Sequence, residues 1–160
     1  MTPTELEKKF WKHLDDDRTV FLSCEGALPR PMYAAFDEEA SPIWFFTNWE
    51  TDLGDALRTG PKQGVMTFSS KGNDLWASVS GKLSVDKDRA TLDRLWNPVV
   101  SAWYDGGKDD PKLLLVRYDA TEAEIWEDTS TLVAGVKSLL GMNPQQDAAE
   151  EKKAHVRMNG

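Results

Sequence analysis

The stretch GVMTFSSKGNDLWASVSGKLSV, residues 64–85, predicts two β-strands joined by a tight turn. The strands are Gly64–Ser69 and Leu75–Val85, and both are bounded by the small and polar residues that end strands. Between them, Lys71-Gly72-Asn73-Asp74 has the composition of a turn. Because two strands connected so briefly run antiparallel, this hairpin predicts an antiparallel sheet.

Strands follow strands along most of the chain. The other predicted strands are Thr19–Cys24, Leu28–Phe36, Ile43–Thr47, Leu113–Tyr118 and Ala123–Glu127. Alternation of strands with long helices is typical of parallel sheets, whereas consecutive strands favour an antiparallel sheet or barrel. The sequence therefore predicts a mainly β fold and argues against a doubly wound α/β fold.

Apolar periodicity and capping residues predict helices at about residues 3–15, 52–58, 89–103 and 132–140. Thr51 caps the second helix, and Gly141 ends the last one. Pro98 lies inside the third, so a kink or break is expected near Asn97. Residues 1–142 are expected to form one domain, and residues 143–160 a polar, mobile tail.

Composition excludes several classes of function. The 160 residues carry a net charge of −8, with 19 Lys and Arg against 27 Asp and Glu. This balance argues against a nucleic-acid partner and against binding to an anionic membrane surface. No apolar run is long enough to span a bilayer and the N-terminus is charged, so a cytoplasmic protein is expected. The single cysteine, Cys24, allows no internal disulfide, and no residue cluster predicts a metal site.

Common catalytic motifs are absent from the sequence. It contains no GxGxxG, no Walker A motif and no GxSxG elbow. We interpret the two histidines, His13 in the first helix and His155 in the tail, as solvated or half-buried residues rather than as a catalytic base or a metal ligand. We interpret Cys24 as a small buried hydrophobic residue rather than as a nucleophile. No catalytic residue is assigned from the sequence.

One constellation favours a planar, phosphorylated ligand. Arg30-Pro31-Met32 is followed by the aromatic strand Ile43–Thr47 and by the helix that Thr51 caps. Arginine and a helix N-terminus suit a phosphate, and aromatic side chains suit a flat ring. The seven tryptophans fit such a ligand, a subunit interface or a core equally well. The alternative is that Arg30 lies on the surface and the aromatic residues only fill the core.

Short motifs follow one another in a fixed order over nearly the whole chain: Lys9–Lys12 with Arg18–Val20, Arg30–Met32, Ile43–Thr47, Val79–Gly81, Leu95–Pro98, Ala102–Tyr104 with Gly106–Pro111, and Ala123–Trp126. In order and spacing the chain resembles the general stress protein branch of the pyridoxamine 5'-phosphate oxidase-like superfamily, the FMN-binding split barrels. The resemblance implies a six-stranded antiparallel split β-barrel of Greek-key type with flanking α-helices. It also implies a homodimer with FMN, or alternatively FAD, at the subunit interface.

The resemblance also implies which residues bind the cofactor. One strand runs along the flavin to its phosphate, and the next strand, a hydroxyl and two indoles contact the cofactor elsewhere. A later loop contributes two further positions, Gly107 and Lys108. One more tryptophan, Trp103, lies beside this loop. In this chain these positions are Arg30, Pro31, Met32, Phe46, Thr47, Thr51, Trp76, Trp126, Gly107, Lys108 and Trp103.

The chain departs from the true oxidases of the superfamily at three positions. Asp52 and Leu53 stand where those enzymes place basic residues after the Thr51 position, which predicts weaker cofactor binding. Lys108 is expected to replace part of the missing charge. Ala35 stands where the oxidases carry a lysine for the substrate phosphate, and the Arg-x-His motif near the C-terminus of the oxidases has no counterpart after Trp126. No pyridoxamine 5'-phosphate oxidation is therefore expected.

Three functions are compatible with this sequence. The first is an FMN-dependent oxidoreductase or flavin reductase of the general stress type, with an unknown substrate. The second is a flavin carrier or redox sensor without turnover. The third is a dimeric interaction protein whose pocket stays empty because of Asp52 and Leu53.

Overall fold

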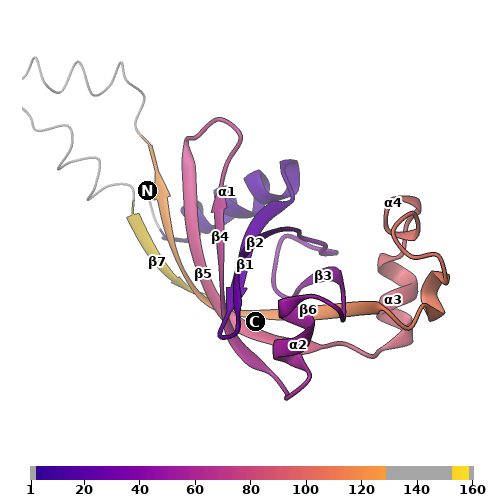
Figure 1. Ribbon diagram of the computed structural model, residues 1–160. Helices are drawn as coiled ribbons and strands as arrows, with labels where there is room; N and C mark the ends of the chain where they lie inside the picture. The colour runs from indigo at the N-terminus through magenta and orange to yellow at the C-terminus, as the bar shows by residue number, and fades with distance from the viewer. Residues whose placement is uncertain (1–2, 129–152, 159–160) are drawn as a thin grey trace, which may run out of the picture.

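The sheet runs in the order β2-β1-β4-β5-β6-β3, and β7 also pairs with β6. Every pairing is antiparallel. The computed structural model describes residues 3–128 and 153–158 (Figure 1). Its elements are α1 (Pro3–Asp16), β1 (Thr19–Cys24), β2 (Ala27–Tyr33), β3 (Ile43–Asn48), α2 (Asp52–Leu57), β4 (Lys62–Ser69), β5 (Leu75–Val85), α3 (Arg89–Leu95), α4 (Pro98–Ser101), the short 3₁₀ helix η1 (Gly107–Asp109), β6 (Leu113–Glu127) and β7 (Lys153–Arg157).

The two ends of this path almost meet. Ala35, just beyond β2, forms a single antiparallel bridge with Trp44 of β3. No ladder continues from it, so the sheet curls into a barrel that stays open between β2 and β3. We call these two unpaired strand edges the split. The mainly β, antiparallel split barrel expected from the sequence is confirmed, with one more strand than the six expected.

A single long strand, β6, replaces the two strands predicted at residues 113–118 and 123–127. It pairs with β5 from Val116 to Glu127, and Thr121 is the extra residue of a bulge opposite Ser80 and Gly81. Polar residues around Thr121 separate the two predicted strands. A bulge accommodates them without ending the ladder.

The tail contains a strand that the sequence analysis missed. Residues 153–157 form β7, which pairs with β6 from Glu122 to Trp126. Ala154, Val156 and Met158 are buried against the barrel. The polar tail expected from residue 143 is therefore wrong for this segment, because β7 buries alternate residues. The helix predicted at residues 132–140 and its Gly141 cap lie outside the described residues.

Helix α1 packs against β5, β6 and β7 and closes one end of the barrel. Its buried stripe is Leu6, Phe10, Trp11 and Leu14. The Phe10 ring meets that of Phe68 edge-on, with 6.0 Å between centroids. The amphipathic periodicity predicted for this helix thus points into the main core.

The predicted break near Asn97 is confirmed. Helix α3 ends at Leu95, and α4 begins at Pro98 with the Asn97 side chain accepting a hydrogen bond from the Val100 amide. Together α3, α4 and η1 project beyond the sheet as an arm (Figure 1). The arm connects β5 to β6.

Tyr118 crosses the barrel interior and depends on two glycines. Its side chain is fully buried, and its hydroxyl donates to the carbonyl of Val79, 2.6 Å away, beside the carbonyl of Gly64. A Cβ on Gly81 would lie 2.6 Å from the carbonyl oxygen of Asp119 and 2.8 Å from the Tyr118 ring. The sheet can close around Tyr118 only where β5 lacks a side chain.

We expect Gly81→Ala to lower the free energy of unfolding by about 1–3 kcal/mol, because the added methyl meets backbone and a buried ring that cannot move away. Urea unfolding followed by tryptophan fluorescence measures the change. Gly72→Ala is the matched control, since a Cβ there meets nothing closer than 3.5 Å. Equal stability of both variants would contradict this account of the barrel interior.

Candidate functional site

The predicted phosphate-binding residues lie at the split. If the register of the Ala35–Trp44 bridge is continued, Met32 stands across from Thr47 and Arg30 across from Trp49. Met32 is buried, whereas Arg30 and Pro31 are exposed. The Arg30 side chain forms no hydrogen bond or ion pair within the described part of the chain. Arg30 is thus a cation available for a ligand at this edge.

Strand β3 forms the opposite edge of the split. Thr47 is buried, and its carbonyl accepts a 2.6 Å hydrogen bond from the hydroxyl of Tyr104. Phe46, on the other face, contacts the Trp96 ring, which in turn contacts Tyr104. Burial raises the pKa of Tyr104 to about 12, so this hydroxyl stays protonated and keeps donating at physiological pH. These contacts fix the arm to β3.

Thr51 is the N-cap of α2, as the sequence predicts. Its hydroxyl donates to the carbonyl of Asn48 over 2.7 Å and accepts from the amide of Gly54 over 3.1 Å. Because the single hydroxyl proton already forms this hydrogen bond, Thr51 can donate to a phosphate only if its hydrogen bond to the Asn48 carbonyl breaks. Asp52, the next residue, is exposed. Of the predicted site residues at this end, Arg30 alone carries a positive charge.

Trp76 and Trp126 lie in another part of the sheet. They are register partners on β5 and β6, on the outer face of the barrel. Trp76 is 37% exposed, and Trp126 is half-buried. Three strand spacings and three residues separate Trp76 from Arg30, a distance of roughly 17 Å along the sheet. One chain does not bring the two groups together.

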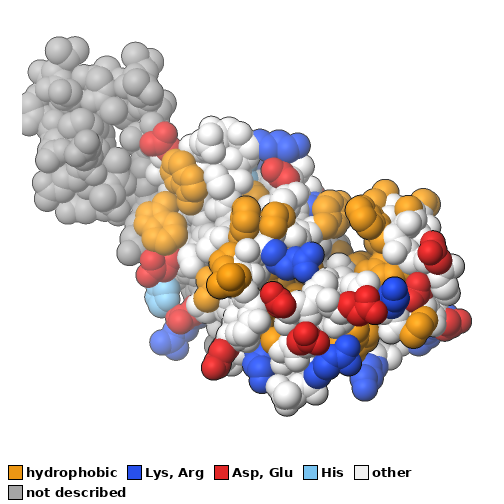
Figure 2. All heavy atoms as spheres, viewed as in Figure 1, with side chains coloured by type: hydrophobic (Ala, Val, Ile, Leu, Met, Phe, Trp, Pro, Cys, Tyr) orange, Lys and Arg blue, Asp and Glu red, His pale blue; other side chains and the backbone are white. Residues whose placement is uncertain are grey.

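The outer face that carries Trp76 also exposes other large apolar side chains. Phe21, Tyr33 and Val65 are 49%, 65% and 40% exposed and share this face with Trp76. Figure 2 shows hydrophobic side chains gathered over the sheet and at the end of the arm. Large exposed apolar side chains gathered on one face of a sheet, here set among Thr67, Ser69 and Ser78, are typical of an interaction surface.

The third predicted group lies on the arm. Trp103 is 80% exposed, and Gly107 adopts the left-handed conformation with φ of 65° at the start of η1. The Lys108 ammonium lies 3.0 Å from the carboxylate of Asp93, and this hydrogen bond lowers the pKa of Asp93. Lys108 is therefore already paired within its own arm.

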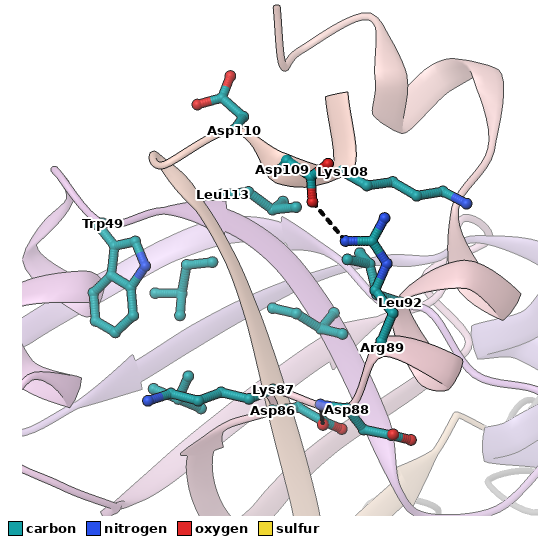
Figure 3. A pocket seen from close by; sticks show the side chains of 13 residues that line it. Trp49, Asp86, Lys87, Asp88, Arg89, Leu92, Lys108, Asp109, Asp110 and Leu113 are labelled. Carbon is teal, nitrogen blue, oxygen red and sulfur yellow. Dashed lines mark hydrogen bonds and ion pairs between the residues drawn. The ribbon is translucent and has the colours of Figure 1, made fainter. Parts of the chain in front are cut away.

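A cavity of about 270 Å³ lies between the arm and the start of β6 (Figure 3). Its walls include Trp49, Leu92 and Leu113, and Arg89 pairs with Asp109 at its rim over 2.7 Å. Of the predicted site residues, only Lys108 lines it. The cavity is thus separate from both the split and the Trp76–Trp126 pair.

Cys24 lies beside a second cavity, on the outer side of β1 and β4. Burial raises the pKa of its thiol. The residue is half-buried, less than the sequence interpretation expected, and it packs against the core.

Sequence reasoning missed the polar residues that β7 brings to the outer face. His155 is the register partner of Glu124, and its Nε2 lies 3.0 Å from a carboxylate oxygen of Glu122. The alternation of polar and apolar residues in Lys-Ala-His-Val-Arg, residues 153–157, is the signal that could have found this strand.

A family model described as "Pyridoxamine 5'-phosphate oxidase like" matches residues 5–147. The chain belongs to this family. Among curated relatives, General stress protein 26 of Bacillus subtilis is 23% identical over 141 residues, which cover 86% of this chain and 96% of that protein. Protein bli-3 of Neurospora crassa is 30% identical over 130 residues, which cover 76% of this chain but only 59% of bli-3.

Solved structures of other oxidase-like family members share the fold. A general stress family protein from Xanthomonas campestris is 50% identical, with a TM-score of 0.75 over 82% of this chain and 92% of that one. The general stress FMN/FAD binding protein of Xanthomonas citri is 48% identical, with a TM-score of 0.74 over 80% and 92%. General stress protein 26 from Jannaschia sp. CCS1 is 29% identical, with a TM-score of 0.78 over 96% and 99%. The chain therefore belongs to the general stress branch of the oxidase-like family.

Two searches of the described residues were negative. Between residues 3 and 128 and in 153–158, no helix is long and apolar enough to cross a membrane. The same residues contain no group of three or more His, Cys, Asp or Glu side chains that could hold a metal ion.

Proposed function

We propose that this chain is a cytoplasmic flavoprotein that binds FMN, or FAD, at a site shared between two copies and uses it as an oxidoreductase or flavin reductase. One observation carries the proposal. The residues expected to bind one cofactor fall into separate groups about 17 Å apart on a single chain, at the split and on the outer face. A second copy that covers the apolar outer face would complete each site.

The donor groups at the split fit a phosphate. Arg30 is exposed and has no other partner within the described residues, so its guanidinium can bind a phosphate in a forked geometry. The edge of β2 leaves room for a ligand because β2 pairs on only one side along Ala27–Tyr33. The acidic Asp52 nearby weakens this end of the site without blocking it.

The outer face fits a flat ring. Trp76 and Trp126 present neighbouring indoles, and the apolar face around them would be costly to leave in water. A homodimer places this face against a second copy and removes it from solvent. This chain is similar to the general stress FMN/FAD binding protein of Xanthomonas citri, and that similarity supports a flavin as the ligand.

The bound flavin would supply the hydride or electron transfer. The chain's own residues hold and shield it: Arg30 fixes the phosphate end, and the indoles of Trp76 and Trp126 cover the ring system and exclude water. Tyr104 holds the arm on β3 through the carbonyl of Thr47. Ala35 offers no cation for a substrate phosphate, which favours a substrate other than pyridoxamine 5'-phosphate.

Purified protein tests the function directly. We expect a yellow protein that releases FMN on denaturation and whose flavin absorbance bleaches when NADH or NADPH is added without oxygen. Stable flavin without bleaching by any nicotinamide donor would instead favour a carrier or redox sensor. A colourless protein that FMN does not bind, with unquenched tryptophan fluorescence, would contradict the proposal, as would oxidation of pyridoxamine 5'-phosphate at an ordinary enzymatic rate.

Arg30→Ala is expected to weaken FMN binding about 10–100-fold, because a charged hydrogen bond contributes roughly 1.5–3 kcal/mol. Titration of tryptophan fluorescence with FMN measures the affinity. Arg117→Ala is the control, since Arg117 is exposed on β6 and pairs with Asp119. Lys108→Ala should weaken binding less, and an unchanged affinity would rule out Lys108 as a substitute for the missing charge.

Phe21→Glu should convert the dimer into a monomer and lower FMN affinity together, because it places a charge in the centre of the apolar outer face. Light scattering reports the mass, which for the dimer is twice 18.0 kDa. Lys12→Gln on α1 is a control that lowers the net charge by the same single unit at an exposed helix position. Full FMN affinity in a monomeric Phe21 variant would contradict the shared site.

A further inference from the structure

The cavity between the arm and the start of β6 combines apolar walls with a charged rim (Figure 3). Leu92 of α3, Leu113 of β6 and the indole of Trp49 contribute apolar surface. The volume of about 270 Å³ lies just below the range of roughly 300–1,000 Å³ in which most small-molecule pockets fall. A ligand of this cavity is therefore small, with one ring or a short branched chain.

Most of the charged side chains on the rim already have partners. Asp86 accepts a hydrogen bond from the indole of Trp44 over 2.9 Å. Asp110 accepts from the amides of Gly106 and Lys112 over 3.0 and 2.9 Å, and these hydrogen bonds lower its pKa. The rim residues that hold a hydrogen bond or an ion pair are Asp86, Asp88, Arg89, Lys108, Asp109 and Asp110.

Two donors at the cavity have no partner among the described residues. The Lys87 side chain is exposed and forms no hydrogen bond or ion pair with them. The indole N–H of Trp49 forms no hydrogen bond with them either, although the Arg58 guanidinium lies over the indole ring, 5.0 Å from its centroid. Figure 3 shows the Lys87 side chain reaching toward the side of the cavity where Trp49 lies. Because an ammonium and an indole N–H can only donate, a ligand here has to supply acceptors.

The charge of the rim favours a carboxylate over a phosphate. Four aspartates and three basic residues line the cavity in the described part of the chain, which gives the lining a net charge of −1. A ligand with one negative charge can pair with Lys87 and is repelled less by the aspartates than a dianionic phosphate, because repulsion grows with the charge of the ligand. The apolar walls favour an apolar body on the same ligand.

We propose that this cavity binds a small monocarboxylate with an apolar body. The carboxylate accepts from the Lys87 ammonium and from the Trp49 indole N–H, and the apolar body packs against Leu92 and Leu113. The cavity shares only Lys108 with the residues assigned to the flavin, and Lys108 is paired with Asp93. This site is therefore independent of the proposed flavin site.

Benzoate is the probe, and the indole signals of the seven tryptophans report where it binds. In the ¹⁵N-labelled full chain each indole N–H gives its own signal, and Trp49→Phe assigns that of Trp49. We expect benzoate to shift the Trp49 signal in a saturable way. The signal of Trp11, which is buried on α1, should stay in place.

Lys87→Gln should weaken benzoate binding about tenfold or more, because it removes a charged hydrogen bond. Lys71→Gln is the matched control, since it removes the same charge from an exposed position in the turn after β4 and should bind like the wild type. Leu92→Phe reduces the space without changing the charge and should also weaken binding. Urea unfolding shows whether each variant is folded.

Three other probes test the class of ligand. Benzyl alcohol, benzylamine and phenyl phosphate carry the same ring with no charge, a positive charge and a phosphate, and each should bind more weakly than benzoate. Equal or tighter binding of any of them would overturn the monocarboxylate.

The remaining outcomes decide the site itself. A Trp49 signal that benzoate does not shift, or equal affinity of Lys87→Gln and the wild type, would overturn the proposal. Displacement of benzoate by FMN would show that the cavity is part of the flavin site and would overturn a separate one. Protein that binds benzoate at Trp49 but binds no FMN would contradict only the proposed function.

Discussion

The edge of β6 that faces away from β5 is shared by two strands, and the rest of the molecule is arranged around this division. β3 pairs with the first part of the edge and β7 with the last. Since β3 ends where β6 begins, its continuation into Thr51 and α2 lies at the split opposite β2. Since β7 takes the far end, its polar face lies next to Trp126. One strand of 15 residues thus positions both the β3 side of the split and the Trp76–Trp126 pair.

The interior of the barrel makes this arrangement rigid. Tyr118, in the middle of β6, donates to the carbonyl of Val79 on β5 and lies beside that of Gly64 on β4. The hydroxyl therefore ties three strands together at the point where Gly81 allows the ring to pass. On the other side of β3, Tyr104 and Trp96 attach the arm. The split stays open between two edges that are each firmly held.

Local signals predicted the parts of the fold that local chemistry decides. The hairpin of residues 64–85, the Thr51 cap and the break before Pro98 depend on residues close together in sequence, and all three are confirmed. The continuity of β6 and the existence of β7 depend on pairing with distant strands, which a polar segment such as residues 119–122 does not reveal. The motif residues of the candidate site were identified from the sequence. Their division between two places on the sheet, and the presence of His155 beside Trp126, follow only from the register of the strands.

Cys24 gives this architecture a chemical consequence. Thiolate, not thiol, reacts with peroxides and disulfides, and burial holds this sulfur in the protonated form. The chain has no second cysteine with which it could form an internal bridge. A member of the general stress branch built this way has no ready sulfur chemistry of its own. Its response to oxidants would therefore pass through whatever redox group binds at the sheet and not through this thiol.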